Sequence, residues 1–69
     1  MGLTQYKTIG ARLKFLRGSK ILKVIADYLG VSIANYYKYE NDMLNISWKN
    51  LKLIAEYYNI SLDELTKGL

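Results

Sequence analysis

The chain has 69 residues, enough for one domain, and its ten Lys and Arg against six Asp and Glu give a formal net charge of +4. It contains no Cys and no His, which excludes disulfides, Cys/His zinc sites and histidine-based acid–base or triad chemistry. Apolar residues make up 51% and Pro is absent, so the composition predicts a folded, helical chain. No apolar run approaches the roughly 20 residues that a membrane span requires.

The first two predicted helices follow an N-terminal arm of residues 1–7. Thr8 can cap a helix over residues 9–17, and Ser19 can cap a second helix over residues 20–29. Apolar residues recur at helical spacing on one face of each: Ile9, Leu13 and Leu16 in the first helix, and Leu22, Ile25, Ala26 and Leu29 in the second.

The third predicted helix follows a turn of only three residues, Gly30 to Ser32. Ser32 is a good N-cap for a helix over residues 33–41. The inward face of this helix is expected to contain Tyr36, Tyr39 and the carbon stem of Glu40. Two helices joined by a tight turn that contains Gly form a helix-turn-helix.

Two more helices are predicted in the remainder of the chain. Ser47 can cap a fourth helix over residues 48–58, and Ser61 opens a capping box that starts a short fifth helix over residues 62–67. The residues expected to face inward from the fourth helix are Trp48, Leu51, Ile54, Ala55 and Tyr58. The expected fold is all-α, a compact five-helix bundle over residues 8–67.

Positive charge is concentrated in the first three predicted helices. Residues 1–40 carry seven basic and two acidic residues, a net charge of +5, whereas residues 41–69 carry three basic and four acidic residues, a net charge of −1. Neutralisation of phosphates drives the sequence-independent part of nucleic-acid affinity, so the first half suits a polyanion. A Lys-rich surface that serves only solubility is the other interpretation.

Five short segments follow one another in a distinctive order. They are Ile9-Gly10-Ala11-Arg12-Leu13-Lys14, then Ala26 with Leu29-Gly30-Val31-Ser32, then Tyr39-Glu40-Asn41, then Leu51 with Ile54-Ala55, and finally Ile60-Ser61-Leu62-Asp63-Glu64-Leu65. Together they resemble the Xre/Cro family of DNA-binding domains, the family of phage repressors and Cro proteins. The resemblance covers about residues 8–66 and implies the lambda-repressor-like helix-turn-helix fold.

The resemblance implies DNA-binding roles for the third helix. The residues that match the face entering the major groove are Ser32, Ile33, Ala34, Asn35, Tyr37 and Lys38. Ser32 and Asn41 match positions that usually contact phosphates. Arg17 and Glu40 match an ion pair that ties the first helix to the third, and a guanidinium suits a partly buried bidentate pair. The first two helical residues are apolar, so they can contact a thymine methyl group but cannot read guanine.

The sequence departs from the family pattern at two places. Leu22 stands where the family often has a Gln that contacts a phosphate, and Lys20 or Lys23 could replace that contact. Asp42 stands where a Gly is usual, and Met43-Leu44 replace the basic residues that often follow. This loop is expected to hold phosphates less well than its counterparts.

Several apolar residues lie off the predicted core faces. Phe15 and Tyr28 are expected to be covered by the N-terminal arm, with a partner surface as the alternative. An apolar patch on the fourth helix and the tail is a candidate homodimer interface, because a two-fold interface uses one patch twice. Its members are Leu53, Tyr57 and Leu69. Packing of the C-terminal tail within one chain is the rival interpretation.

These observations predict a sequence-specific DNA-binding transcription regulator, Cro/repressor-like, that binds operator duplex DNA through the recognition helix 33–41 as a homodimer. The alternative is a protein-interaction module on the same fold, an antitoxin-like or antirepressor partner with weakened DNA contacts. No nucleophile–base–orienter set is suggested by the spacing, so an enzyme is not expected. No metal or cofactor is expected, and 69 residues leave no room for a separate effector domain, so no small-molecule effector is expected either. By resemblance, the source would be a bacterium or a phage and the location cytoplasmic.

Overall fold

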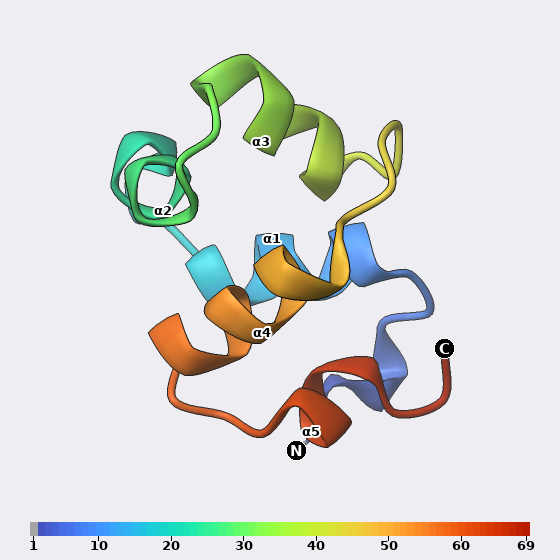
Figure 1. Ribbon diagram of the computed structural model, residues 1–69. Coiled ribbons are helices and arrows are strands. Elements are labelled where there is room, and N and C mark those ends of the chain that lie inside the picture. Colours follow the sequence, from blue (N-terminus) through green and yellow to red (C-terminus); the bar gives the residue numbers. More distant parts are fainter. Residues whose placement is uncertain (1) are drawn as a thin grey trace.

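Residues 2–69 are described by the computed structural model, and they contain five α-helices around one core (Figure 1). The helices are α1 (Ile9–Arg17), α2 (Leu22–Leu29), α3 (Ile33–Glu40), α4 (Trp48–Tyr57) and α5 (Leu62–Thr66), preceded in the N-terminal arm by the 3-10 helix η1 (Leu3–Gln5). No strand occurs in this part of the chain. The all-α fold predicted from the sequence is therefore confirmed.

Four of the helices begin at a hydroxyl cap, as predicted. In each, the side-chain oxygen of the N-cap residue accepts a hydrogen bond of 3.0–3.1 Å from the backbone N–H three residues later. The pairs are Thr8 with Ala11, Ser32 with Asn35, Ser47 with Asn50, and Ser61 with Glu64. These bonds satisfy N–H groups that have no partner within the helix itself.

The start of α2 differs from the prediction. The helix begins at Leu22 rather than Lys20, so Ser19 does not cap it. The reason is the preceding turn, in which the Arg17 guanidinium donates a hydrogen bond to the carbonyl of Lys20 at 3.0 Å. The N–H of Lys20 in turn donates to the carbonyl of Arg17 at 3.1 Å. These two bonds fold the chain between α1 and α2 and delay the start of the helix by two residues.

The other helix boundaries agree with the prediction to within one residue. The third, fourth and fifth helices each end one residue before the predicted position. The backbone angles of the residues predicted to be last are no longer helical, and these residues serve as C-caps: Asn41, Tyr58 and Lys67. The backbone of Lys67 has ψ 126°, for example, which is extended. Differences of this size are usual at helix ends, where the final carbonyls no longer have partners within the helix.

The core lies where the inward faces of the five helices meet. Every helix contributes at least one side chain with no more than 2% of its surface exposed: Leu13 of α1, Ile25 of α2, Tyr36 of α3, Ile54 of α4 and Leu65 of α5. Helix α1 packs against α3 and α5, and α4 packs against α2 and α5. The helical periodicity therefore identified the inward side of the first four helices.

One predicted core residue lies outside the core. Trp48 is the first residue of α4, and 64% of its surface is exposed. The core contacts of α4 begin one turn later, at Leu51, and continue through Ile54 and Ala55. Helical spacing places Trp48 on nearly the same side as Ala55, but the helix extends beyond the core at that end.

Two tyrosines fill the core side of α3, as predicted, but their hydroxyl groups differ. The hydroxyl of Tyr39 accepts a hydrogen bond from the side-chain amide of Asn50 at 3.3 Å. The buried hydroxyl of Tyr36 has no hydrogen-bond partner among residues 2–69. Burial raises the pKa of Tyr36 well above its usual value, so this side chain stays neutral in the folded protein.

Arg12, which the sequence did not distinguish from the surface cations, is buried with 1% of its surface exposed. Its Nε donates a hydrogen bond to the carbonyl of Tyr6 at 2.9 Å, and its Nη1 donates to the carbonyl of Leu65 at 3.0 Å. One side chain thus joins the N-terminal arm and α5 to α1. Both acceptors are backbone atoms, so no residue type in the sequence indicates this contact.

The N-terminal arm packs on one of the two aromatic residues expected beneath it and covers it in part. Tyr6 stacks on Phe15 with ring centroids 4.9 Å apart, as predicted. Tyr28 instead packs against Tyr57 of α4 at 5.0 Å, and its hydroxyl donates a hydrogen bond to Glu56 at 3.0 Å. Because α2 packs directly on α4, Tyr28 contacts the neighbouring helix rather than the arm, and 43% of its surface stays exposed.

Candidate nucleic-acid interface

The turn between α2 and α3 is short and closed by backbone hydrogen bonds. Gly30 has φ 73°, a left-handed conformation that a residue without a Cβ adopts at little cost. Its N–H donates to the carbonyl of Asp27 at 3.1 Å, and the N–H of Val31 donates to the carbonyl of Ala26 at 3.0 Å. The turn ends α2 and directs α3 across the top of the molecule as drawn in Figure 1.

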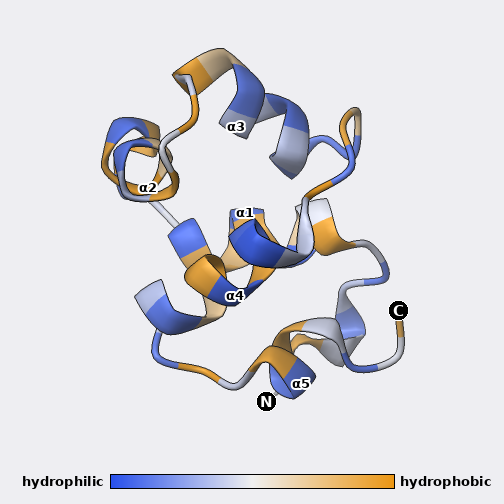
Figure 2. Cartoon of the chain, viewed as in Figure 1, coloured by the Kyte–Doolittle hydropathy of each residue, from blue (hydrophilic) through white to orange (hydrophobic). Residues whose placement is uncertain are grey.

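Helix α3 presents one face to solvent. All the residues in and before it that were predicted to face the major groove are exposed: Ser32, Ile33, Ala34, Asn35, Tyr37 and Lys38. The buried side contains Tyr36, Tyr39 and Glu40. Strongly hydrophobic colour is confined to the first turn of α3 in Figure 2, and the rest of the helix is hydrophilic. The structure therefore brings the predicted base-reading side chains together on an accessible surface.

A bidentate ion pair holds the C-terminal end of α3. Arg17 Nε and Nη2 donate to Glu40 Oε2 and Oε1 at 2.7 and 3.0 Å. The Glu40 side chain is 1% exposed, and its hydrogen bond raises the pKa of Arg17 above the ordinary value. The ion pair expected between these residues is present, and it joins the end of α1 to the end of α3.

Asp42 joins the same two helices at the other end of α1, a role that the sequence did not indicate. Its Oδ1 accepts a hydrogen bond from the N–H of Gly10, in the first turn of α1, at 2.9 Å. A Cβ on Gly10 would lie 2.6 Å from the carbonyl oxygen of Glu40, so α1 approaches the end of α3 closely. Gly10 and Asp42 are 32 residues apart, and no local pattern in the sequence connects them.

The cationic side chains near the exposed face of α3 differ in their contacts within the chain. Lys23 Nζ lies 2.8 Å from Asp27 Oδ2, and both side chains are exposed. Lys20 and Lys38 are exposed as well. The side-chain amide of Asn41, predicted to contact a phosphate, donates a hydrogen bond to the carbonyl of Tyr37 at 2.8 Å. One amide hydrogen of Asn41 is therefore used to cap α3.

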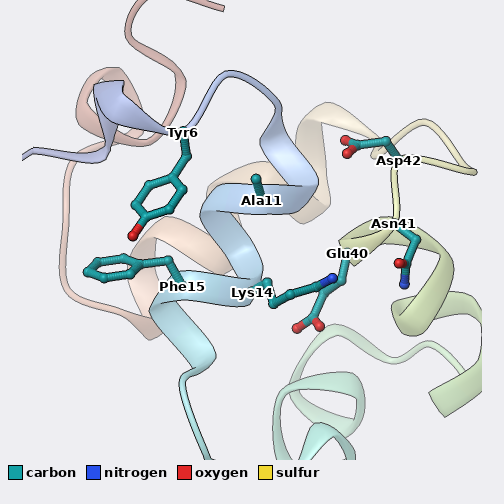
Figure 3. A pocket seen from close by; sticks show the side chains of 7 residues that line it. All are labelled: Tyr6, Ala11, Lys14, Phe15, Glu40, Asn41 and Asp42. Atoms are coloured by element: carbon teal, nitrogen blue, oxygen red, sulfur yellow. The ribbon is translucent and has the colours of Figure 1, made fainter.

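A shallow hollow of about 440 Å³ lies beside the end of α3 (Figure 3). Its walls are the stacked aromatic pair on one side and the polar end of α3 on the other, and its lining residues are Tyr6, Ala11, Lys14, Phe15, Glu40, Asn41 and Asp42. Both carboxylates in this hollow have partners within the chain, Arg17 and Gly10. The arrangement serves to hold α1 against α3.

The three residues predicted to form a homodimer patch have different surroundings. Leu53 and Tyr57 are half-buried on α4, where Tyr57 contacts the rings of Tyr28 and Tyr58. Leu69 lines a second hollow, of about 330 Å³. The other residues that line it are Ile9, Asn45, Ile46, Leu51 and Thr66. Helical spacing could not show the surroundings of Leu69, because the path of the C-terminal tail depends on the packing of α5.

Comparison with known proteins agrees with the geometry of α2, the turn and α3. The family model described as Helix-turn-helix matches residues 13–65, which is more than half of the chain. Comparison with the curated proteins and with the solved structures gave no match. No helix within residues 2–69 combines the length and apolar character needed to cross a membrane. The chain belongs to the Xre/Cro-like helix-turn-helix family of DNA-binding regulators.

Proposed function

We propose that the protein is a transcription regulator that binds operator duplex DNA through the exposed face of α3 and acts by occupying the site. The observation that carries this proposal is the accessibility of the whole predicted base-reading face, opposite a buried face of the same helix. An α-helix fits the major groove of B-form DNA, where each base pair presents a distinct pattern of donors and acceptors.

The chemistry of this face favours particular bases. Ile33, Ala34, Tyr37 and Lys38 follow the spacing i, i+1, i+4 and i+5, and all four are exposed. Apolar side chains at the start of the helix suit thymine methyl groups, so the preferred half-site should contain A·T pairs there. Lys38, at the other end of the face, can donate to guanine or to a phosphate.

Phosphate contacts are expected mainly on the α2 side of the recognition helix. Lys20 and Lys23 lie there, whereas the loop after α3 has Asp42, Met43 and Leu44 in place of cations. The exposed start of α3, capped by Ser32, adds backbone N–H groups that favour an anion. This distribution of charge supports stronger contacts with the DNA phosphate backbone on one side of the groove than on the other.

A binding titration tests the proposal. The full chain is titrated with random-sequence duplex DNA at two salt concentrations, and preferred sites are then selected from a random pool. We expect affinity to fall with salt, because bound lysines release counterions, and selection to enrich A·T-containing sites.

The site of contact is tested with the enriched duplex. Amide shifts on its addition should be centred on residues 32–38. Shifts confined to α4 and α5, or no salt-dependent binding to any duplex, would contradict DNA recognition by α3. The second result would favour a protein-interaction module on the same fold.

A further inference from the structure

One of the residues that line the hollow of about 440 Å³ beside the end of α3 is a lysine, Lys14. It lies between Gly10 and Arg17 at the spacing i, i+4 and i+7, so all three share one side of α1. Gly10 bonds to Asp42, and Arg17 bonds to Glu40. Lys14 is exposed, and neither of the ion pairs found within residues 2–69 includes it. Its positive charge is therefore available to an external anion.

Asn41 supplies a second donor at the same place. It is the C-cap of α3, and its side-chain amide donates one hydrogen bond, to the carbonyl of Tyr37 at 2.8 Å. A side-chain amide has two N–H hydrogens, so one of them remains for an acceptor outside the helix. In Figure 3, the side chain of Lys14 extends from α1 toward the end of α3, where Asn41 lies. An ammonium group and an amide N–H thus adjoin the same hollow, a combination that suits phosphate oxygens.

The two carboxylates that line the hollow determine where an anion can bind. Glu40 is 1% exposed, and its charge is balanced by Arg17. Asp42 is exposed and keeps its charge, although its Oδ1 accepts the hydrogen bond from Gly10. In Figure 3, the carboxylate of Asp42 lies near the start of α1, away from Lys14. An anion is therefore favoured at the Lys14 end of the hollow and disfavoured at the Asp42 end.

The floor and the second wall of the hollow are apolar. Ala11, Lys14 and Phe15 are neighbours on one face of α1, at the spacing i, i+3 and i+4. The single methyl group of Ala11 leaves space between the two longer side chains (Figure 3). Phe15, which Tyr6 covers in part, is 44% exposed. Its ring offers an apolar surface of the kind that a sugar ring can contact, opposite the cationic wall.

We propose that this hollow binds one phosphate of the DNA backbone through Lys14 Nζ and the side-chain amide of Asn41, with the adjoining deoxyribose against the ring of Phe15. This inference rests on the proposed function and adds a contact to it, at the end of α3 rather than on the α2 side. A helix that lies in the major groove has a DNA backbone on either side of it. The hollow adjoins the end of α3, so it is within reach of one of these backbones. It supplies there the cation that the loop after α3 lacks.

Neutral backbone replacements test the phosphate site at the level of a single phosphate. The enriched duplex is prepared as a series in which one phosphate at a time is replaced by an uncharged methylphosphonate. One replacement should weaken binding of the unsubstituted chain about fivefold but leave the affinity of Lys14→Ala unchanged, because that variant no longer contacts this phosphate. If every replacement weakens both chains by the same factor, the phosphate site is wrong.

The lysine itself is tested against a control of equal charge. Lys14→Ala should lower affinity about fivefold for all duplexes alike and reduce the salt slope by about one unit. The matched control is Lys67→Ala, which removes the same charge at the end of α5, far from α3 in Figure 1. Equal losses in the two variants would contradict the site, because they would show that only the net charge of the chain matters.

Two further substitutions distinguish the hollow from an ordinary surface lysine. Ala11→Leu fills the floor without changing the charge and keeps a good helix former in α1, so it should weaken duplex binding about fivefold while the helical far-UV signal persists. Asp42→Asn keeps the oxygen that accepts from Gly10 but removes the negative charge, so it should strengthen duplex binding about threefold. Unchanged affinity in both variants would overturn the proposal.

The same titrations separate this inference from the proposed function. If the unsubstituted chain shows no salt-dependent binding to any duplex, DNA binding is wrong and the phosphate site is wrong with it. If the unsubstituted chain binds with amide shifts centred on residues 32–38, but Lys14→Ala and Ala11→Leu bind equally well, recognition by α3 stands and the phosphate site is wrong.

Discussion

The side chain of Glu40 is 1% exposed, and the guanidinium of Arg17 provides its counter-charge. Arg17 keeps 20% of its own side chain in contact with solvent, which reduces the effect of losing its partner. We expect Glu40→Ala to lower the free energy of unfolding by about 1–3 kcal/mol, because Arg17 is left partly buried without a counter-charge. Chemical denaturation measures this change. Lys52→Ala, at an exposed position of α4, should change stability by less than about 0.5 kcal/mol, and an equal loss in both variants would contradict the argument.

The same substitution at the two core tyrosines of α3 should change the free energy of unfolding in opposite directions. Tyr36→Phe removes a buried hydroxyl that has no hydrogen-bond partner, so it should raise the free energy of unfolding by about 1 kcal/mol. Tyr39→Phe removes the acceptor of Asn50 and should lower it by about 0.5–1.5 kcal/mol. Thermal or chemical unfolding distinguishes the two. A loss of stability in both variants would show that the Tyr36 hydroxyl has a stabilising partner.

The raised pKa of Tyr36 gives this comparison a pH dependence. The folded-state pKa lies above the unfolded-state value of about 10, so above pH 10 the unfolded chain loses this proton before the folded chain does. The free energy of unfolding of the unsubstituted chain therefore falls as the pH rises from about 10 toward the folded-state pKa. The advantage of Tyr36→Phe over the unsubstituted chain should therefore grow above pH 10. Denaturation curves at pH 8 and about pH 10.5 test this, and an unchanged difference would count against it.

At the scale of elements, the closeness of α1 to the end of α3 decides how α3 is positioned. Gly10→Ala adds a Cβ within 2.7 Å of two backbone oxygens, those of Glu40 and Tyr39. We expect a loss of about 1–3 kcal/mol, although Ala is otherwise the better helix former, because α1 must move away from α3. The measurement is chemical denaturation, with amide shifts at residues 39–42 as a second readout.

The control for this substitution is Gly2→Ala, where the added Cβ would meet its nearest atom at 3.7 Å. That contact is ordinary, so the control should retain the stability of the unsubstituted chain. A stabilising effect of Gly10→Ala would show that α1 does not approach the end of α3 closely at Gly10.

The elements also show what a sequence can and cannot predict. The hydroxyl caps at Thr8, Ser32, Ser47 and Ser61 are local, since each residue bonds to the N–H three positions later, and they fixed four helix starts. The start of α2 was missed because a guanidinium, not the hydroxyl of Ser19, organises the preceding turn. The contact of Asp42 with Gly10 joins residues 32 positions apart and that of Arg12 with Leu65 joins residues 53 positions apart, and tertiary packing alone reveals them.

At the scale of the whole molecule, the positive half of the chain and the neutral start of α3 should affect DNA binding differently. The first should set the overall affinity and the second the preferred base sequence. Ile33→Asn replaces a side chain suited to thymine methyl groups by one that pairs with adenine, and should change the selected sequence at a cost of about 1–3 kcal/mol at particular bases. Lys23→Ala should weaken all sequences alike and reduce the salt slope by about one unit. Competition titrations at several salt concentrations separate the two effects. The distinction fails if both variants lose affinity uniformly.

The buried guanidinium of Arg12 has a consequence for how the chain opens. Because it bonds to the carbonyls of Tyr6 and Leu65, one side chain holds both the N-terminal arm and α5, and the two segments should be released in one event. Amide protons of residues 62–66 should then exchange with solvent at a rate coupled to the detachment of the arm. Arg12→Met, which keeps much of the side-chain volume but cannot donate, should speed exchange at both ends while the amides of α2 and α3 remain protected. In this sense the two ends of the sequence form one cooperative unit of the fold.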